Sequence, residues 1–137
     1  MVHALQEAHR LLKPDGYMIE MRPGRKHREL GLIRAGEWQW IGTMVERFGD
    51  DRAASAAVAQ ILRAGLFRRV RYLSVEIPRV MDTPKDFHDW LADFDGLPPH
   101  DWLEARLGAA LLAAKGEVAI IVRGPLEIRL MRKQERT

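Results

Sequence analysis

The sequence predicts an α/β fold, with a small sheet of about three strands flanked by helices. Helix-like stretches alternate with short strand-like ones along residues 5–21, 51–80 and 102–132. In the helix-like stretches apolar residues recur every three or four positions, whereas in the strand-like ones they tend to alternate with polar residues. The chain has 137 residues, about the length of one domain, and we therefore expect residues 1–137 to form a single domain.

The first helix and the first strand are joined by a proline-glycine turn. Leu5, Ala8 and Leu12 fall on one side of a helix. The segment Pro14–Gly16 ends that helix because proline and glycine both interrupt a helical pattern. The mostly apolar segment Tyr17–Met21 then follows as a short strand.

The residues after this strand are predicted to be helical. One apolar stripe at helical spacing is formed by Trp40, Ile41, Met44, Val45 and Phe48. Trp38 and Trp40 are two residues apart and cannot face the same side of a helix. We therefore expect one of them to be buried and the other to pack on a neighbouring element or to line a pocket. An alanine-rich helix over residues 51–63 comes next, with Gly65 as its C-terminal cap.

The second half of the chain continues the alternation. Residues 70–80 read as a strand, and Thr83 with Pro84 behind it is typical of a helix start. A further helix is predicted over residues 102–115. The tail then holds two strand-like pieces, Glu117–Val122 and Leu126–Arg132.

Composition limits the classes of function that the chain can serve. It contains no cysteine, which excludes disulfides, thiolate metal sites and cysteine nucleophiles and fits a cytoplasmic protein. No apolar run approaches the roughly 18 residues of a membrane span, so we expect no membrane partner. The five histidines are scattered, and we expect no metal site. The formal charge is only +3, and we interpret the arginine clusters as solvated surface, which makes a nucleic-acid partner unlikely.

The phrase Glu7–Gly16 resembles a segment of class I S-adenosylmethionine-dependent methyltransferases. In that family a helix ends in an "EhRvLKPGG" phrase and leads into the fifth strand of a Rossmann-like sheet, and Asp15 stands here where the first glycine usually stands. Residues Ile61–Val70 resemble the helix, turn and sixth strand that follow. The resemblance implies a mixed sheet like strands 5-7-6 of the family, with Leu126–Arg132 as the last strand, inserted between the other two and antiparallel to them.

The resemblance covers only the C-terminal half of such an enzyme. The family's glycine-rich cofactor loop has no counterpart, because the sequence contains no Gly-x-Gly-x-Gly, and we therefore assign no cofactor-binding residue. The resemblance implies the acceptor-side half of a methyltransferase, or a fragment of one, inactive alone and using S-adenosylmethionine only when paired with a cofactor half. The free edge of Tyr17–Met21 would pair either with that separate N-terminal half or with a second copy, forming a homodimer.

Candidate site residues follow from the end of the first strand, since ligands in open α/β sheets bind outside strand carboxyl ends. Glu20 and His27 are the candidate catalytic groups, and Arg22 is a candidate substrate contact. The resemblance adds Trp38 and Trp40 as substrate contacts, because the segment after this strand often shapes the acceptor pocket in the family. The structural alternative is that Glu20 pairs with an arginine, His27 is solvated and the tryptophans are core.

Two other classes of function stay open. The chain could be a non-catalytic α/β module that evolved from a methyltransferase and serves in interaction or dimerisation. More weakly, its arginines could bind nucleic acid or phosphate, and such binding would fall steeply with salt.

Overall fold

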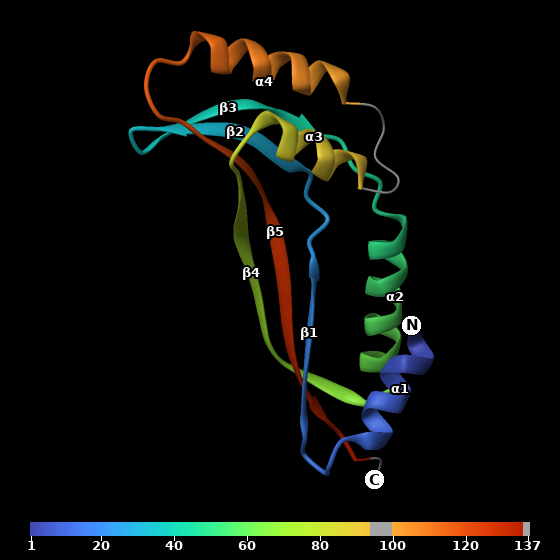
Figure 1. Ribbon diagram of the computed structural model, residues 1–137. Helices are drawn as coiled ribbons and strands as arrows, with labels where there is room; N and C mark the ends of the chain where they lie inside the picture. Colours follow the sequence, from blue (N-terminus) through green and yellow to red (C-terminus); the bar gives the residue numbers. More distant parts are fainter. Residues whose placement is uncertain (94–99, 136–137) are drawn as a thin grey trace. The chain divides into compact units, whose positions relative to one another are not determined.

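The computed structural model describes residues 1–93 and 100–135 and contains in them four helices and five strands (Figure 1). In chain order the elements are α1 (Val2–Leu11), β1 (Tyr17–Pro23), β2 (Arg28–Arg34), β3 (Glu37–Met44), α2 (Gly49–Arg63), β4 (Phe67–Met81), α3 (Pro84–Ala92), α4 (Asp101–Ala113) and β5 (Ala119–Lys133). The five strands form one sheet of order β1-β5-β2-β3, with β4 also paired to β5.

The chain divides into two compact units. The first contains residues 1–25, 48–75 and 126–137, and the second contains residues 26–47 and 76–125. β4 and β5 each contribute residues to both units.

In the first unit β5 lies between β1 and β4 (Figure 1). β1 pairs antiparallel with β5, from Tyr17 opposite Arg132 to Pro23 opposite Leu126. One face of this sheet packs on α1 and α2 through a core that includes Val58, Ile61, Leu66, Phe67 and Met131. Because side chains alternate along a strand, β1 turns Met18 toward this core and leaves its other face, with Ile19, exposed.

In the second unit β2 and β3 form an antiparallel hairpin, and β2 also pairs with the start of β5. Helices α3 and α4 cover the core of this unit, which consists of Leu30, Leu32, Ile41, Met44, Met81, Phe87, Leu103, Leu107, Ile120 and Val122. Gly42 lets α4 approach β3 closely, since a Cβ built there would lie 2.4 Å from the Leu103 side chain.

The predicted helices outside the hairpin are confirmed. The alanine-rich helix is α2, and Gly65 after it has φ +69° with its N–H donating to the Leu62 carbonyl over 3.1 Å. Thr83 caps α3 as expected. Its hydroxyl accepts from the Asp86 amide, and the Asp86 carboxylate accepts from the Thr83 amide over 2.8 Å.

The helix predicted around Trp40–Phe48 is wrong, because most of that segment belongs to the hairpin. Arg34 lies opposite Glu37, so the turn consists of two residues, Ala35 and Gly36. Both have positive φ, +50° and +80°, as the tight turns that match strand twist require.

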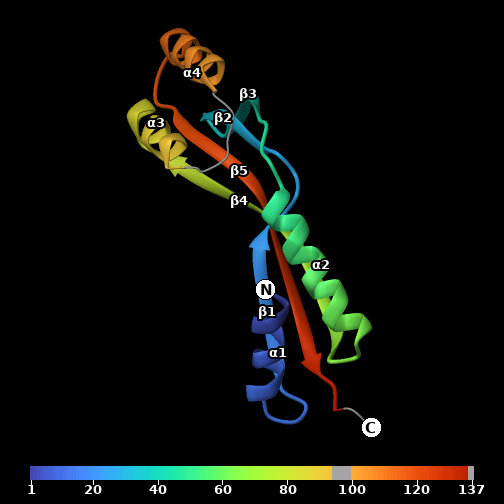
Figure 2. The same cartoon turned by 90° about the vertical axis from the view of Figure 1, so that its right-hand side faces the viewer.

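The predicted α/β class is confirmed, but the mixed sheet of about three strands is wrong: the sheet has five strands and is antiparallel. The hairpin supplies the two additional strands. Every pair with a defined register is antiparallel, and β4 and β5 run in opposite directions (Figure 2). β5 separates β1 from β4, so the two strands that run the same way never pair. The two predicted tail strands are one strand, because Gly124 and Pro125 lie between the stretches that pair with β2 and β1.

The turn between α1 and β1 holds Asp15 in the left-handed region, at φ +60°. A Cβ is disfavoured in this conformation, so glycine is the residue that adopts it most readily. Aspartate is one of the few other residues that adopt the conformation, and here its carboxylate also lies 2.9 Å from the Arg132 guanidinium.

The effect of replacing Asp15 on stability should therefore depend on how readily the new residue adopts a positive φ. We expect Asp15→Gly and Asp15→Asn to stay within about 0.5 kcal/mol of the parent, because exposed ion pairs contribute little. Asp15→Val should lower the free energy of unfolding by roughly 1–2 kcal/mol. Urea unfolding measures the difference. Lys13→Val, which has an ordinary backbone conformation, serves as control, and an equal loss in both valine variants would contradict the assignment.

Candidate functional site

Two candidate residues of β1 belong to a network of four charged side chains. Glu20 lies opposite Arg129 and Arg22 lies opposite Glu127 across the β1–β5 pair. The Glu20 carboxylate is 2.7 Å from the Arg129 guanidinium and 3.1 Å from that of Arg22. Arg129 also contacts Glu127 at 2.6 Å. Two carboxylates and two guanidiniums therefore balance one another.

The network is largely shielded from solvent. The Arg22 side chain is only 9% exposed and also donates to the Asp51 carbonyl over 3.3 Å. Burial alone would lower the pKa of Arg129, but its hydrogen bonds to Glu20 and Glu127 outweigh that effect and raise it. Arg129 therefore stays charged at any physiological pH.

This environment confirms that Glu20 pairs with arginines. Because two guanidiniums already hold its carboxylate, proton abstraction by Glu20 would require the network to open. Its catalytic role, and substrate contact by Arg22, stay predictions. Sequence reasoning missed Glu127 and Arg129, which lie more than one hundred positions away and carry no local signal.

Trp38 lies in the second unit and stacks on Arg123, whose guanidinium carbon is 4.0 Å from the ring centroid. Arg123 also pairs with Glu29 at 3.0 Å and with Glu76 at 3.5 Å. Gly31 makes room for the ring, because a Cβ there would lie 2.5 Å from two carbons of Trp38. Absence of a side chain at Gly31 thus permits this cation–π contact.

Trp40 follows two positions later on β3 and is 49% exposed. Its ring centroid lies 5.3 Å from the guanidinium carbon of Arg106 on α4, and that carbon is 5.8 Å from the ring of Trp102. Neither Trp38 nor Trp40 is buried, so the expectation that the tryptophans are core is wrong. Trp40 is the more accessible of the two to a ligand.

His27 is half-buried just before β2, rather than solvated. Its Nδ1 accepts a hydrogen bond from the Glu46 amide over 3.1 Å. The same Glu46 carboxylate pairs with Arg28. A histidine whose Nδ1 accepts can abstract a proton only with that bond broken or through its other nitrogen. Glu20 and Arg22 belong to the first unit, and His27, Trp38 and Trp40 to the second.

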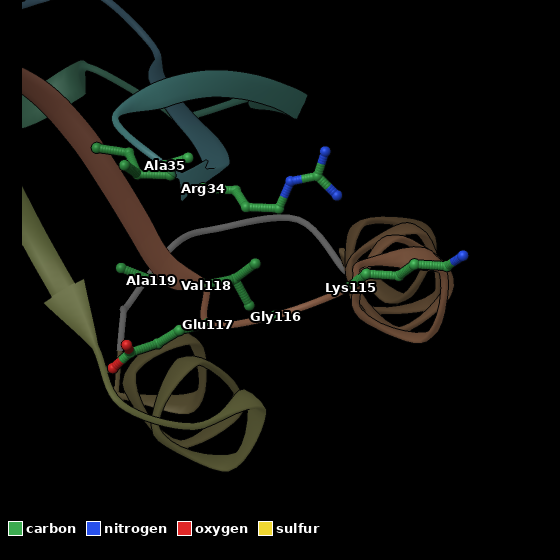
Figure 3. Close-up of a pocket in the computed structure, with 8 residues that line it drawn as sticks. Arg34, Ala35, Lys115, Gly116, Glu117, Val118 and Ala119 are labelled. Atoms are coloured by element: carbon green, nitrogen blue, oxygen red, sulfur yellow. The ribbon is translucent and has the colours of Figure 1, made fainter.

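A cavity of about 580 Å³ lies in the second unit between the hairpin turn and the segment that joins α4 to β5 (Figure 3). Its lining residues are Ile33, Arg34, Ala35, Lys115, Gly116, Glu117, Val118 and Ala119. Figure 3 shows the Glu117 carboxylate pointing away from the ends of Arg34 and Lys115. None of the residues predicted from the sequence lines this cavity, and its charged groups do not converge.

Within residues 1–93 and 100–135 no three histidine or carboxylate side chains gather as metal ligands would. No helix of the described ranges is long and apolar enough to cross a membrane. The sequence matches no protein-family model, and comparisons with curated proteins and with solved structures gave no match.

Removing one charge from the Glu20 network should destabilise the protein. Glu20→Gln leaves two guanidiniums in a shielded environment with one carboxylate, and we expect the free energy of unfolding to fall by roughly 2 kcal/mol. Glu7→Gln breaks the exposed Glu7–Arg10 pair and should cost less than about 0.5 kcal/mol. Chemical denaturation measures the free energy of unfolding of both variants. Equal losses would mean that the network does not hold β1 to β5.

A side chain at Gly31 should displace Trp38. Gly31→Ala introduces contacts of 2.5 Å with the ring and 2.6 Å with the Gln39 carbonyl, and we expect a loss of roughly 2 kcal/mol. Gly49→Ala, at the open first position of α2, should leave stability unchanged or raise it slightly. Thermal unfolding compares the two, and a neutral Gly31→Ala would show that Trp38 does not need this space.

Proposed function

We propose that this chain supplies the acceptor side of a class I S-adenosylmethionine-dependent methyltransferase and acts only together with a cofactor-binding half. The observation that carries the proposal is the strand arrangement of the first unit. β5, the last strand, lies antiparallel between β1, which follows the Lys13–Gly16 corner, and β4, which follows the Gly65 turn. This order supports the 5-7-6 arrangement that the resemblance implies.

The turn geometry supports the same proposal. Asp15 adopts the left-handed conformation at the position where the resembling phrase has glycine. The sequence phrase and the backbone therefore agree at a residue where few side chains fit.

Methyl transfer itself requires mainly alignment of an already activated cofactor with its acceptor. This chain has no glycine-rich loop to hold the adenosyl group, so the partner half would bring S-adenosylmethionine. β1 offers a place for that half: among the described residues only β5 pairs with it. Tyr17, Ile19 and Met21 are 55%, 62% and 63% exposed on one face of the strand. A neighbouring strand with its helices would cover that face.

The alternative is a non-catalytic module that dimerises through the same edge. An antiparallel pair of two β1 strands centred on Ile19 would place Tyr17 of each copy opposite Met21 of the other. These contacts on the exposed face are apolar, which favours self-pairing. On the other face Glu20 would lie opposite Met18 of the other copy, with its carboxylate already paired to Arg22 and Arg129 of its own unit. Oligomeric state distinguishes this alternative from the half-enzyme.

The test is calorimetric titration of the chain with S-adenosylhomocysteine, with its mass measured by light scattering on the same sample. We expect no binding by the chain alone and binding once the product of the reading frame directly upstream is co-purified with it. Ile19→Lys should abolish that co-purification, whereas Leu112→Lys, which changes a 92% exposed residue of α4, should not.

Other results would change the proposal. A stable dimer that never binds S-adenosylhomocysteine, and that Ile19→Lys converts to a monomer, would favour the non-catalytic module. Micromolar binding of S-adenosylhomocysteine by the chain alone would contradict the division into halves.

A further inference from the structure

The first half of β4 is an open sheet edge. Among the described residues β4 pairs only with β5, so the backbone N–H and C=O groups of its other edge have no strand partner. The six residues Arg68–Leu73 are all exposed. An extended edge of this kind is a template for one more strand.

Within residues 1–93 and 100–135, the charges on this edge have no ion-pair partner. Arg68, Arg69 and Arg71 form no ion pair with any described residue. β1 differs, because both of its charged side chains, Glu20 and Arg22, are paired within the unit. Against the part of the chain that the structure describes, the first unit therefore presents three cations without an ion-pair partner on one strand.

Apolar side chains alternate with these arginines. Val70, Tyr72 and Leu73 are 44%, 46% and 43% exposed. Val70 and Tyr72 share one face of the strand, and neighbouring exposed apolar side chains are a feature of interaction surfaces. Because cations and apolar side chains occupy neighbouring positions, they suit a partner that carries both acidic and apolar side chains.

We propose that Arg68–Leu73 of β4 binds an extended acidic segment of a partner protein, which adds to the sheet as a strand. Because side chains of a strand alternate between faces, Arg69 and Arg71 share one face. The partner strand would place carboxylates two positions apart opposite them and an apolar side chain between, opposite Val70. Opposite charges across a strand pair are stabilising, and like charges are not.

Charge alone would also suit nucleic acid. The open backbone edge and the interleaved apolar side chains favour a peptide, because main-chain hydrogen bonding requires a strand, whereas phosphate contacts use cations without needing the edge. The site lies on the opposite side of β5 from β1, so it is independent of the proposed methyltransferase pairing.

The test uses the full chain and a fluorescein-labelled decapeptide of alternating glutamate and valine, with binding measured by fluorescence anisotropy. We expect saturable binding, weakened about tenfold by Arg69→Glu/Arg71→Glu because two attractive cross-strand pairs become repulsive. Arg34→Glu/Arg47→Glu changes net charge equally at exposed arginines outside β4 and should alter affinity less than about twofold. Circular dichroism checks that each variant is folded. If Arg69→Glu/Arg71→Glu does not fold, Arg69→Gln/Arg71→Gln takes its place.

Two further probes separate the mechanisms. Two versions of the same peptide are N-methylated at every second residue, one on the valines and the other on the glutamates. Each version lacks the N–H donors of one strand edge. The version that lacks the donors facing β4 should not bind. Equal binding of both N-methylated peptides and the parent would overturn strand addition. So would absence of binding by the parent peptide, or tighter binding of a twelve-residue oligothymidylate with the same dependence on Arg69 and Arg71, which would make the site a nucleic-acid contact.

Discussion

Backbone hydrogen bonding to β5 is the constraint on which the rest of the structure depends. This strand pairs with β1, with β2 and with β4, while β1 and β4 pair with no other described strand. β1 and β5 lie at nearly opposite ends of the sequence, with Tyr17 opposite Arg132. The pairing of β1 therefore cannot form until β5, more than one hundred residues further along, is available. Contacts of such high sequence separation make folding intrinsically slow.

The charged network of the first unit favours the observed register of this pairing. Glu20 faces Arg129 and Arg22 faces Glu127 only in the observed register, and a slip of one residue would turn each of these side chains to the opposite face. Removing charges from water costs free energy that the ion pairs recover only in part. The network therefore contributes more to the choice of register than to net stability, which accounts for four charged residues in a shielded position without invoking catalysis.

The sequence was informative where signals are local. Thr83 with Pro84, and the left-handed Gly65, mark helix ends through contacts within a few residues, and both were predicted. The hairpin was missed because a β-bulge at Leu30 and Gly31 shifts the register: Leu30 lies opposite Gly42 and Gly31 opposite Trp40, which leaves Ile41 unpaired. Ile41 and Gly42 are then both buried, and this break in alternation imitates helical spacing. The partners of Glu20 could not be predicted, since they depend on strand pairing between distant segments.

The two outer strands of the first unit offer different chemistry to a partner. The charged side chains of β1 are paired within the unit, and its exposed face is apolar around Ile19. It would therefore suit an apolar strand, including that of another copy. On β4, Arg69 and Arg71 form no ion pair with a described residue. Two copies of β4 side by side would bring these like charges near one another, which disfavours self-pairing. Charge on an edge strand commonly prevents indiscriminate association. The same arginines that disfavour a second copy would favour an acidic strand, so the two proposals assign a different partner to each edge of the unit.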